Sequence, residues 1–221
     1  MAYGALLTDA NGVPFYIADT MPVSLTQKIS YNVSAGLSSR VLFANDGVLR
    51  MVFVGNNAAQ ANSSSCEYLQ LENNNWILYS SGAARTIDVY IFGYNYQPVP
   101  SWGIQINDDQ GRCILTNETK VLRDVQALGN PSSDTASGYK INQTLSGHWA
   151  VAPQNTGLYT AVANTNGQPI PVQAWYYATA RWNGSTTQIT SGYRGDASGG
   201  TSNQTYINSR SRITAINVDR Y

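Results

Sequence analysis

Residues 3–12 read YGALLTDANG, and residues 102–111 repeat their pattern as WGIQINDDQG. An aromatic residue, the glycine after it, an aspartate and a final glycine keep the same spacing in both copies. In each copy one apolar run leads into the turn and another follows it, at residues 13–17 and 113–115. This is the pattern of a β-hairpin whose turn needs a residue with positive φ. The repetition predicts that two related β modules follow one another along the chain.

The ends of the two modules match as well. Residues 79–94 (YSSGAARTIDVYIFGY) align without gaps with residues 206–221 (YINSRSRITAINVDRY). The aligned pairs include Arg85 with Arg212, Val89 with Ile216, and Tyr94 with Tyr221. Alternating residues of a strand share a face, so Ile87, Val89 and Ile91 are expected on one side. Both segments are therefore predicted to be closing strands that pack on the core.

A proline-containing connector separates the two modules at residues 95–101 (NYQPVPS). Two prolines one residue apart favour an extended, fairly stiff segment. We therefore predict two tandem β-sandwich or jelly-roll-like domains, residues 1–97 and 98–221, related by the internal repeat. The first is assigned to docking, because its loops are shorter and its hairpin lies at the terminus, and the second is expected to be exposed. The alternative is one large sandwich in which the connector is an edge loop.

Composition favours strands over helices. Charged residues make up 12% of the chain, about half of the roughly 25% usual in soluble proteins. Asn, Ser, Thr and Gly take their place, and these residues favour turns and short strands. The one helix candidate lacks clear caps and is also predicted to be a strand. The predicted strands are residues 23–31, 37–43, 48–54, 66–71 and 76–79 in the first domain, and 121–128 (the helix candidate), 139–143, 148–152, 158–163 and 172–182 in the second.

Charge and hydropathy exclude several kinds of partner. The 13 basic and 13 acidic residues give a formal net charge of zero, so nothing supplies the phosphate neutralisation that nucleic-acid binding needs. No apolar stretch approaches the ~20 residues that span a bilayer. Residues 1–4 lack the basic and apolar regions of a signal peptide. We therefore expect synthesis in the cytoplasm, no membrane insertion and no nucleic-acid partner.

No catalytic or metal-binding set is recognisable. His148 is the sole histidine, and no nucleophile motif accompanies it, so it is expected to pack at the end of a strand. Cys66 and Cys113 are the only cysteines, and they are predicted to be buried thiols rather than a disulfide or zinc ligands. No nucleotide-binding fingerprint is present. The protein is therefore predicted to be a non-enzyme without metal or cofactor.

Aromatic residues are the one enriched feature that points to binding. The chain has 15 tyrosines and 5 tryptophans, and such rings dominate interface hot spots and stack on sugars and peptides. Residues 183–205 are predicted to form a long, exposed loop. Candidate contact residues within or just before it are Trp175, Tyr177, Trp182, Tyr193 and Arg194. Ordinary core packing is the alternative for each ring, because one face of an alternating strand is usually buried.

Residues 1–12, with their echo at residues 102–103, resemble the start of small β-rich proteins encoded among the tail genes of tailed bacteriophages. The resemblance implies a virion tail protein, at the tail tip or associated with a fibre, that assembles with other tail proteins into an oligomer. It also implies a part in binding a host receptor, either a surface glycan or an outer-membrane protein. No site residue follows from it. The alternatives are a lectin-like carbohydrate-binding module and a capsid decoration protein.

Overall fold

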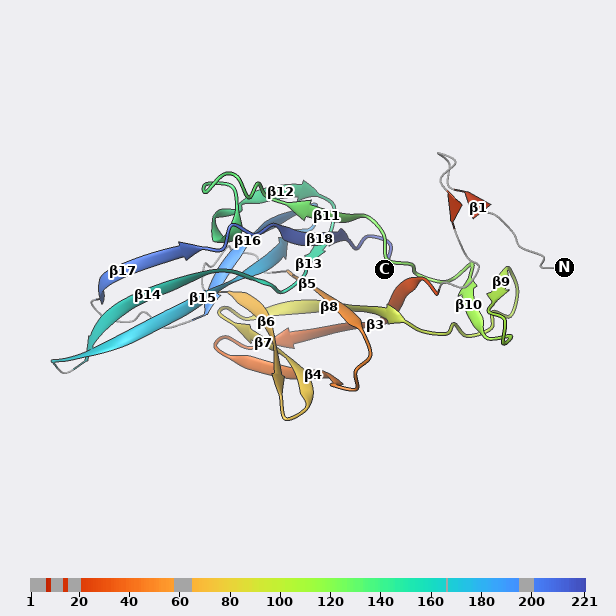
Figure 1. Cartoon of the computed structure of the whole chain (residues 1–221), viewed down its shortest axis with the longest axis horizontal. Helices are drawn as coiled ribbons and strands as arrows, with labels where there is room; N and C mark the ends of the chain where they lie inside the picture. The colour runs from red at the N-terminus through yellow and green to blue at the C-terminus, as the bar shows by residue number, and fades with distance from the viewer. Residues whose placement is uncertain (1–6, 9–13, 16–20, 58–64, 166, 195–200) are drawn as a thin grey trace.

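The computed structural model describes residues 7–8, 14–15, 21–57, 65–165, 167–194 and 201–221, and within them the chain is all-β (Figure 1). This confirms the prediction that the chain is all-β. A short 3₁₀ turn, η1 (Gly138–Lys140), is the one helical element among these residues. Figure 1 shows a central body of strands, a long hairpin that projects from it at one end, and two small hairpins at the other end.

The first half of the chain contains two groups of three strands. Between residues 21 and 94, its described strands are β3 (Val23–Val33), β4 (Ser38–Ala44), β5 (Arg50–Asn56), β6 (Cys66–Glu72), β7 (Asn75–Ser81) and β8 (Arg85–Tyr94). In one group β8 pairs with β3 and β5, and in the other β7 pairs with β4 and β6. Ile87, Val89 and Ile91 of β8 lie in one buried cluster, as their alternation predicted. This cluster joins the two groups of strands.

The second half repeats this pairing and adds two strands. From residue 121 onward, its described strands are β11 (Val125–Leu128), β12 (Gln143–Ser146), β13 (Trp149–Val151), β14 (Asn155–Thr165), β15 (Gln168–Trp182), β16 (Thr186–Arg194), β17 (Thr201–Asn208) and β18 (Ile213–Asn217). β18 pairs with β11 and β13, as β8 pairs with β3 and β5. β16 pairs with β12 and β15, as β7 pairs with β4 and β6. By this pairing β14 and β17 have no counterpart among the described strands of the first half, although the sequence alignment matches residues 79–81 of β7 with residues 206–208 of β17. β14 forms the long projecting hairpin with β15.

Aligned residues of the two closing strands pair with the corresponding neighbouring strand in each half. Val89 of β8 pairs with Val54 of β5. Ile216 of β18, which aligns with Val89, pairs with Ala150 of β13. Val89 and Ile216 therefore occupy corresponding places in the two halves.

The two small hairpins also share a register. In the hairpin of β1 (Leu7–Thr8) and β2 (Pro14–Phe15), Thr8 pairs with Pro14. In the hairpin of β9 (Gln105–Asn107) and β10 (Cys113–Thr116), the residues at the corresponding positions of the repeat, Asn107 and Cys113, form a pair. Gly111 in the second turn has a φ of 78°, which is the positive value that the motif predicted. Residues 3–6 and 9–12 of the first copy lie outside the described residues.

Strands of the two halves pair directly with each other. β5 pairs antiparallel with β13 at Val54 and Val151, and parallel with β15 at Asn56 and Arg181. A sheet of eleven strands therefore runs through both halves of the described chain, and it curls around the body in Figure 1. Two separate tandem sandwiches are consequently not confirmed, because strands that would be edges of separate domains are paired. The predicted boundaries, residues 1–97 and 98–221, therefore describe the two copies of the repeat, and they stay a prediction.

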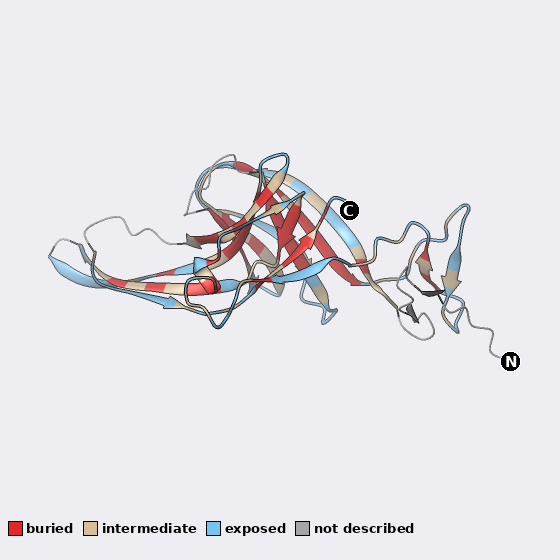
Figure 2. Cartoon of the chain, turned by 90° about the horizontal axis from the view of Figure 1, so that it is seen from above, coloured by how far each residue is buried: buried red, intermediate tan, exposed pale blue. Residues whose placement is uncertain are grey.

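A mixed hydrophobic cluster also joins the halves. Phe53, Tyr90 and Phe92 of the first half pack with Ala150 and Ile216 of the second. These five side chains are almost completely buried, with no more than 4% of any residue exposed. In Figure 2 the buried residues gather in the strands of the body. The two halves therefore share part of their core.

A buried polar cluster crosses from β6 and β8 to β15. Arg85 and Glu67 form an ion pair of 2.7 Å, and their side chains are 1% and 2% exposed. Asn56 donates a hydrogen bond to Oε1 of Glu67 at 3.2 Å, and the Thr179 hydroxyl donates to Oε2 at 3.1 Å. Arg181 is also buried; desolvation lowers its pKa, and the negative charge of Glu67 opposes that shift. Glu67 therefore links charged and polar groups of both halves.

The predicted long loop at residues 183–205 was wrong over most of its length. β16 and the start of β17 occupy it, and residues 195–200 lie outside the described residues. The turn before β16 is short because the side-chain oxygen of Asn183 accepts hydrogen bonds from the backbone N–H groups of Ser185 and Thr186, at 3.0 and 2.9 Å. This local bonding starts the next strand at once.

One smaller prediction also needs correction. Residues 139–143, predicted to be a strand, contain the end of η1 and only the first residue of β12. The connector at residues 95–101 contains no helix or strand, and the backbone N–H of Gln97 donates to the carbonyl of Cys113 at 2.8 Å. Its first residues are therefore fastened to the small hairpin that follows.

Candidate binding site

A groove lined by tyrosines lies on one face of four neighbouring strands. Each strand contributes one ring: Tyr159 from β14, Tyr176 from β15, Tyr193 from β16 and Tyr206 from β17. Tyr159 pairs directly with Tyr206, and Tyr176 with Tyr193, and directly paired residues share a face of a sheet. This tyrosine groove has a volume of about 280 Å³ and is completed by Ala174, Thr201 and Gln204.

The rings of the groove are tilted against one another. The centroids of Tyr159 and Tyr206 are 4.9 Å apart, with 48° between the ring planes. Those of Tyr176 and Tyr193 are 5.8 Å apart, with 59° between the planes. Tilted rings present aromatic surface from several directions, so a flat or ring-shaped ligand can pack against more than one of them.

η1 adds a further ring beside the groove. Tyr139 stacks on Tyr176 with 4.8 Å between the centroids. Gly157 in β14 makes this approach possible, because a Cβ there would lie 2.7 Å from the Tyr139 ring. The side-chain amide of Asn208 donates to the backbone carbonyl of Ser137 at 3.1 Å and fastens the start of η1 to β17. The turn is thus positioned by strands on both sides of the groove.

The groove is electrically neutral. Among the described residues that line it, none carries a formal charge. Burial raises the pKa of Tyr176 to about 12, so its phenol is neutral at physiological pH. The hydroxyl of Tyr159 and the amide of Gln204 both donate to the hydroxyl of Thr201, at 3.2 and 2.8 Å. The groove therefore combines aromatic faces with uncharged hydrogen-bonding groups.

The structure places the five predicted contact residues in three different regions. Tyr193 lines the tyrosine groove. Trp175, Tyr177 and Arg194 lie on the opposite face of β15 and β16, where Trp175 is directly paired with Arg194. Trp182 lies at the far end of β15 from the groove. They do not form one site, and their role in binding stays a prediction.

On the face opposite the groove, aromatic rings from the two halves stack. Tyr177 stacks on Tyr68 of β6 with 4.8 Å between centroids, and Tyr68 stacks on Tyr79 of β7 at 5.2 Å. The guanidinium of Arg194 lies 4.9 Å from the centre of the Tyr68 ring. Tyr177 and Arg194 therefore contribute to packing between the halves, whereas Trp175 is 41% exposed.

Sequence reasoning missed Tyr159, Tyr176 and Tyr206. Because side chains alternate along β15, Tyr176 lies on the other face from Trp175 and Tyr177. The turn before β16 is short, and turn length fixes the register of a hairpin, so the sequence could have predicted that Tyr176 pairs with Tyr193. Tyr159 and Tyr206 meet through β14 and β17, which are separated by two other strands in the sequence. No local pattern indicates that pairing.

His148, Cys66 and Cys113 were the remaining candidate groups. His148 stacks on Trp182 with 4.3 Å between ring centroids, and burial lowers its pKa. Cys66 and Cys113 are buried free thiols, as predicted, and burial raises the pKa of Cys66 to about 11. Within the described ranges, no three His, Cys, Asp or Glu side chains gather in a way that could hold a metal ion.

No protein-family model matches the chain, and neither does any curated protein or solved structure. No helix in the described part of the chain is long and apolar enough to cross a membrane. The feature of the described structure that bears on function is therefore the tyrosine groove.

Proposed function

We propose that the protein is a non-enzymatic, contact-forming part of a bacteriophage tail, and that its second half binds a glycan on the host surface. The tail location is supported by the resemblance of residues 1–12 and 102–103 to proteins encoded among phage tail genes. The binding role is supported by the tyrosine groove, which is the observation that carries the proposal.

The tyrosine groove has the composition of a sugar-binding site. Aromatic faces pack against the C–H groups of a pyranose ring, while neutral hydroxyl and amide groups exchange hydrogen bonds with its hydroxyls. Tyr206 is 52% exposed and presents its ring to a ligand, whereas Tyr159 is 7% exposed and forms the base. Thr201 and Gln204 supply polar atoms without charge. This chemistry favours a neutral glycan.

The domain arrangement that accords with this function is a duplicated β module in which the second copy has gained two strands. β14 and β17, the added strands, both line the groove. Glycan binding therefore belongs to the second copy, and the first copy is left to dock with other tail proteins. This division follows the predicted roles of residues 1–97 and 98–221.

Replacing Tyr206 with serine tests the glycan site. We expect Tyr206→Ser to weaken binding about tenfold, because one aromatic face worth about 1–1.5 kcal/mol is lost. The ligand is first found by screening the full chain on an array of bacterial surface glycans, and the affinity of each variant is then measured by titration calorimetry.

Ile207→Ser is the matched control, since Ile207 is a 51% exposed apolar residue that follows Tyr206 in β17 and therefore lies on the opposite face of the same strand. It should leave the affinity unchanged. Failure of every neutral glycan to bind, or equal losses in both variants, would contradict the glycan site.

Immunogold labelling of phage particles tests the location, and label on the tail is expected. Label on the capsid would favour a decoration protein, and no label on the particle would favour a free lectin.

A further inference from the structure

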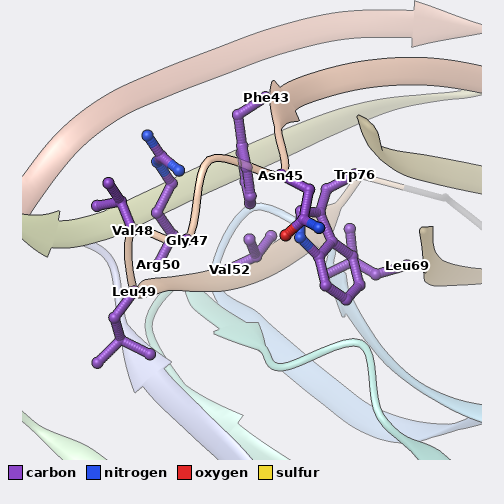
Figure 3. Close-up of a pocket in the computed structure, with 9 residues that line it drawn as sticks. All are labelled: Phe43, Asn45, Gly47, Val48, Leu49, Arg50, Val52, Leu69 and Trp76. Atoms are coloured by element: carbon purple, nitrogen blue, oxygen red, sulfur yellow. The ribbon is translucent and has the colours of Figure 1, made fainter. Parts of the chain in front are cut away.

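A second hollow lies in the first half, between β5 and the three-stranded sheet of β4, β7 and β6 (Figure 3). This apolar pocket has a volume of about 340 Å³, within the range of about 300–1,000 Å³ usual for ligand sites. The rings of Phe43 and Trp76 and the side chains of Val52 and Leu69 line it. It is therefore large enough for an aromatic side chain and offers apolar surface on several sides.

The charged groups at the pocket are already paired. Arg50 donates two hydrogen bonds to the carboxylate of Asp46, at 2.6 and 2.7 Å, and its guanidinium lies 4.8 Å from the centre of the Phe43 ring. The hydrogen bonds from Arg50, with another from the backbone N–H of Val48, hold the pKa of Asp46 well below its usual range. An entering charged group would lose hydration without gaining a free partner, so the pocket favours an uncharged, apolar group.

The most exposed large apolar side chains of the described chain lie just before the β9–β10 hairpin. Val99, Trp102 and Ile104 are 68%, 75% and 67% exposed, and we call them the aromatic knob. Gly103, with a φ of 115°, fixes the bend behind Trp102, because a Cβ there would lie 2.2 Å from the side-chain oxygen of Asn117. That oxygen accepts the backbone N–H of Ile104 at 3.2 Å. Exposed apolar residues that are close together in the sequence and lie beside a held bend are typical of an interaction site.

We propose that the aromatic knob of one copy of the chain enters the apolar pocket of another copy. Tryptophan seated in an apolar pocket is a frequent anchor of protein interfaces, and the held bend reduces the conformational entropy lost on binding. The formal net charge of zero lets two copies approach without net repulsion. Knob and pocket are different surfaces, so each copy offers one of each. The contact gives the chain a route to self-assembly that does not use the tyrosine groove.

Sedimentation velocity of the full chain over a wide range of concentration tests this contact. The wild-type chain should associate as concentration rises, and Trp102→Ser should raise the dissociation constant at least about thirtyfold, as expected for loss of a hot-spot side chain. Asn45→Phe should do the same from the other side. Asn45 is exposed, and Figure 3 shows it beside Trp76, so a larger ring there fills the pocket without entering the core.

Mixing the two variants gives the decisive result. The intact knob of Asn45→Phe can enter the intact pocket of Trp102→Ser, so the mixture should form one-to-one complexes although each variant alone stays monomeric. Ile170→Ser, which changes a 45% exposed side chain on the projecting hairpin, is the control and should associate like wild type. The proposal would be overturned if the wild-type chain were monomeric, if Trp102→Ser associated normally, or if the mixture formed no complex. Binding of the knob to another tail protein in place of a second copy would also overturn it.

Discussion

Replacing Glu67 with glutamine is expected to lower the free energy of unfolding by about 3–5 kcal/mol, the usual cost of breaking a buried ion pair by removing one partner. Glu67 is 1% exposed, and its Oε1 accepts hydrogen bonds from Nε and Nη2 of Arg85 at 2.9 and 2.7 Å. Glutamine would leave the charge of Arg85 buried without a counterion, beside the buried side chain of Arg181. Urea unfolding followed by tyrosine and tryptophan fluorescence measures the change.

The loss should affect both halves together. Thr179 of β15 donates to Glu67, and Asn56 of β5 donates to both Glu67 and Thr179. We therefore expect one cooperative transition that moves to lower urea, rather than early unfolding of the first half alone. Glu72→Gln is the matched control: Glu72, on the same strand, is only half-buried and accepts a single hydrogen bond from Tyr79, so its replacement should cost less than about 1 kcal/mol. Equal effects of the two substitutions would contradict the role of the cluster.

The repeated features of the fold could be predicted from the sequence because they are local. The hairpin motif and the closing strands depend on residues that are near one another in the sequence. Alternation along β8 correctly predicted that Ile87, Val89 and Ile91 lie on one buried face. The shared sheet depends on which strands meet at their edges, and single-strand patterns do not specify this. One signal was available: residues 52–54 read VFV, and a continuous apolar run is typical of a strand buried on both faces.

The candidate site could be predicted only in part for a similar reason. Alternation separates the two faces of β15 but does not say which face meets the first half and which stays open. The stack of Tyr177 on Tyr68 places that face of β15 against the first half, and these two residues are far apart in the sequence. Composition also misled the prediction at residues 183–205, where Thr, Ser and Gly belong to β16 and not to a loop. Tyr193 was the one predicted residue that lines the groove.

Cutting the chain within residues 98–100, at an inserted protease site, is expected to leave the two halves bound together. Strand β5 keeps its pairing with β13 and β15 after the cut, and the mixed cluster keeps Phe53, Tyr90 and Phe92 away from water. Burial of these three rings contributes up to about 4.5–9 kcal/mol at about 1.5–3 kcal/mol each, which is comparable to the whole stability of a typical domain of about 5–15 kcal/mol. The cut protein should therefore elute as one species and separate only in denaturant.

The two halves made separately should behave differently from the cut protein. Each would expose part of the mixed cluster and a strand edge that is paired in the whole chain, so neither should unfold cooperatively by circular dichroism, and both should aggregate. Mixing the two halves during refolding should restore the cooperative transition, because the missing edge and the missing side of the core are supplied together. Independent, cooperative folding of both halves would instead establish two autonomous domains and would show that the pairing of β5 with the second half adds little to stability.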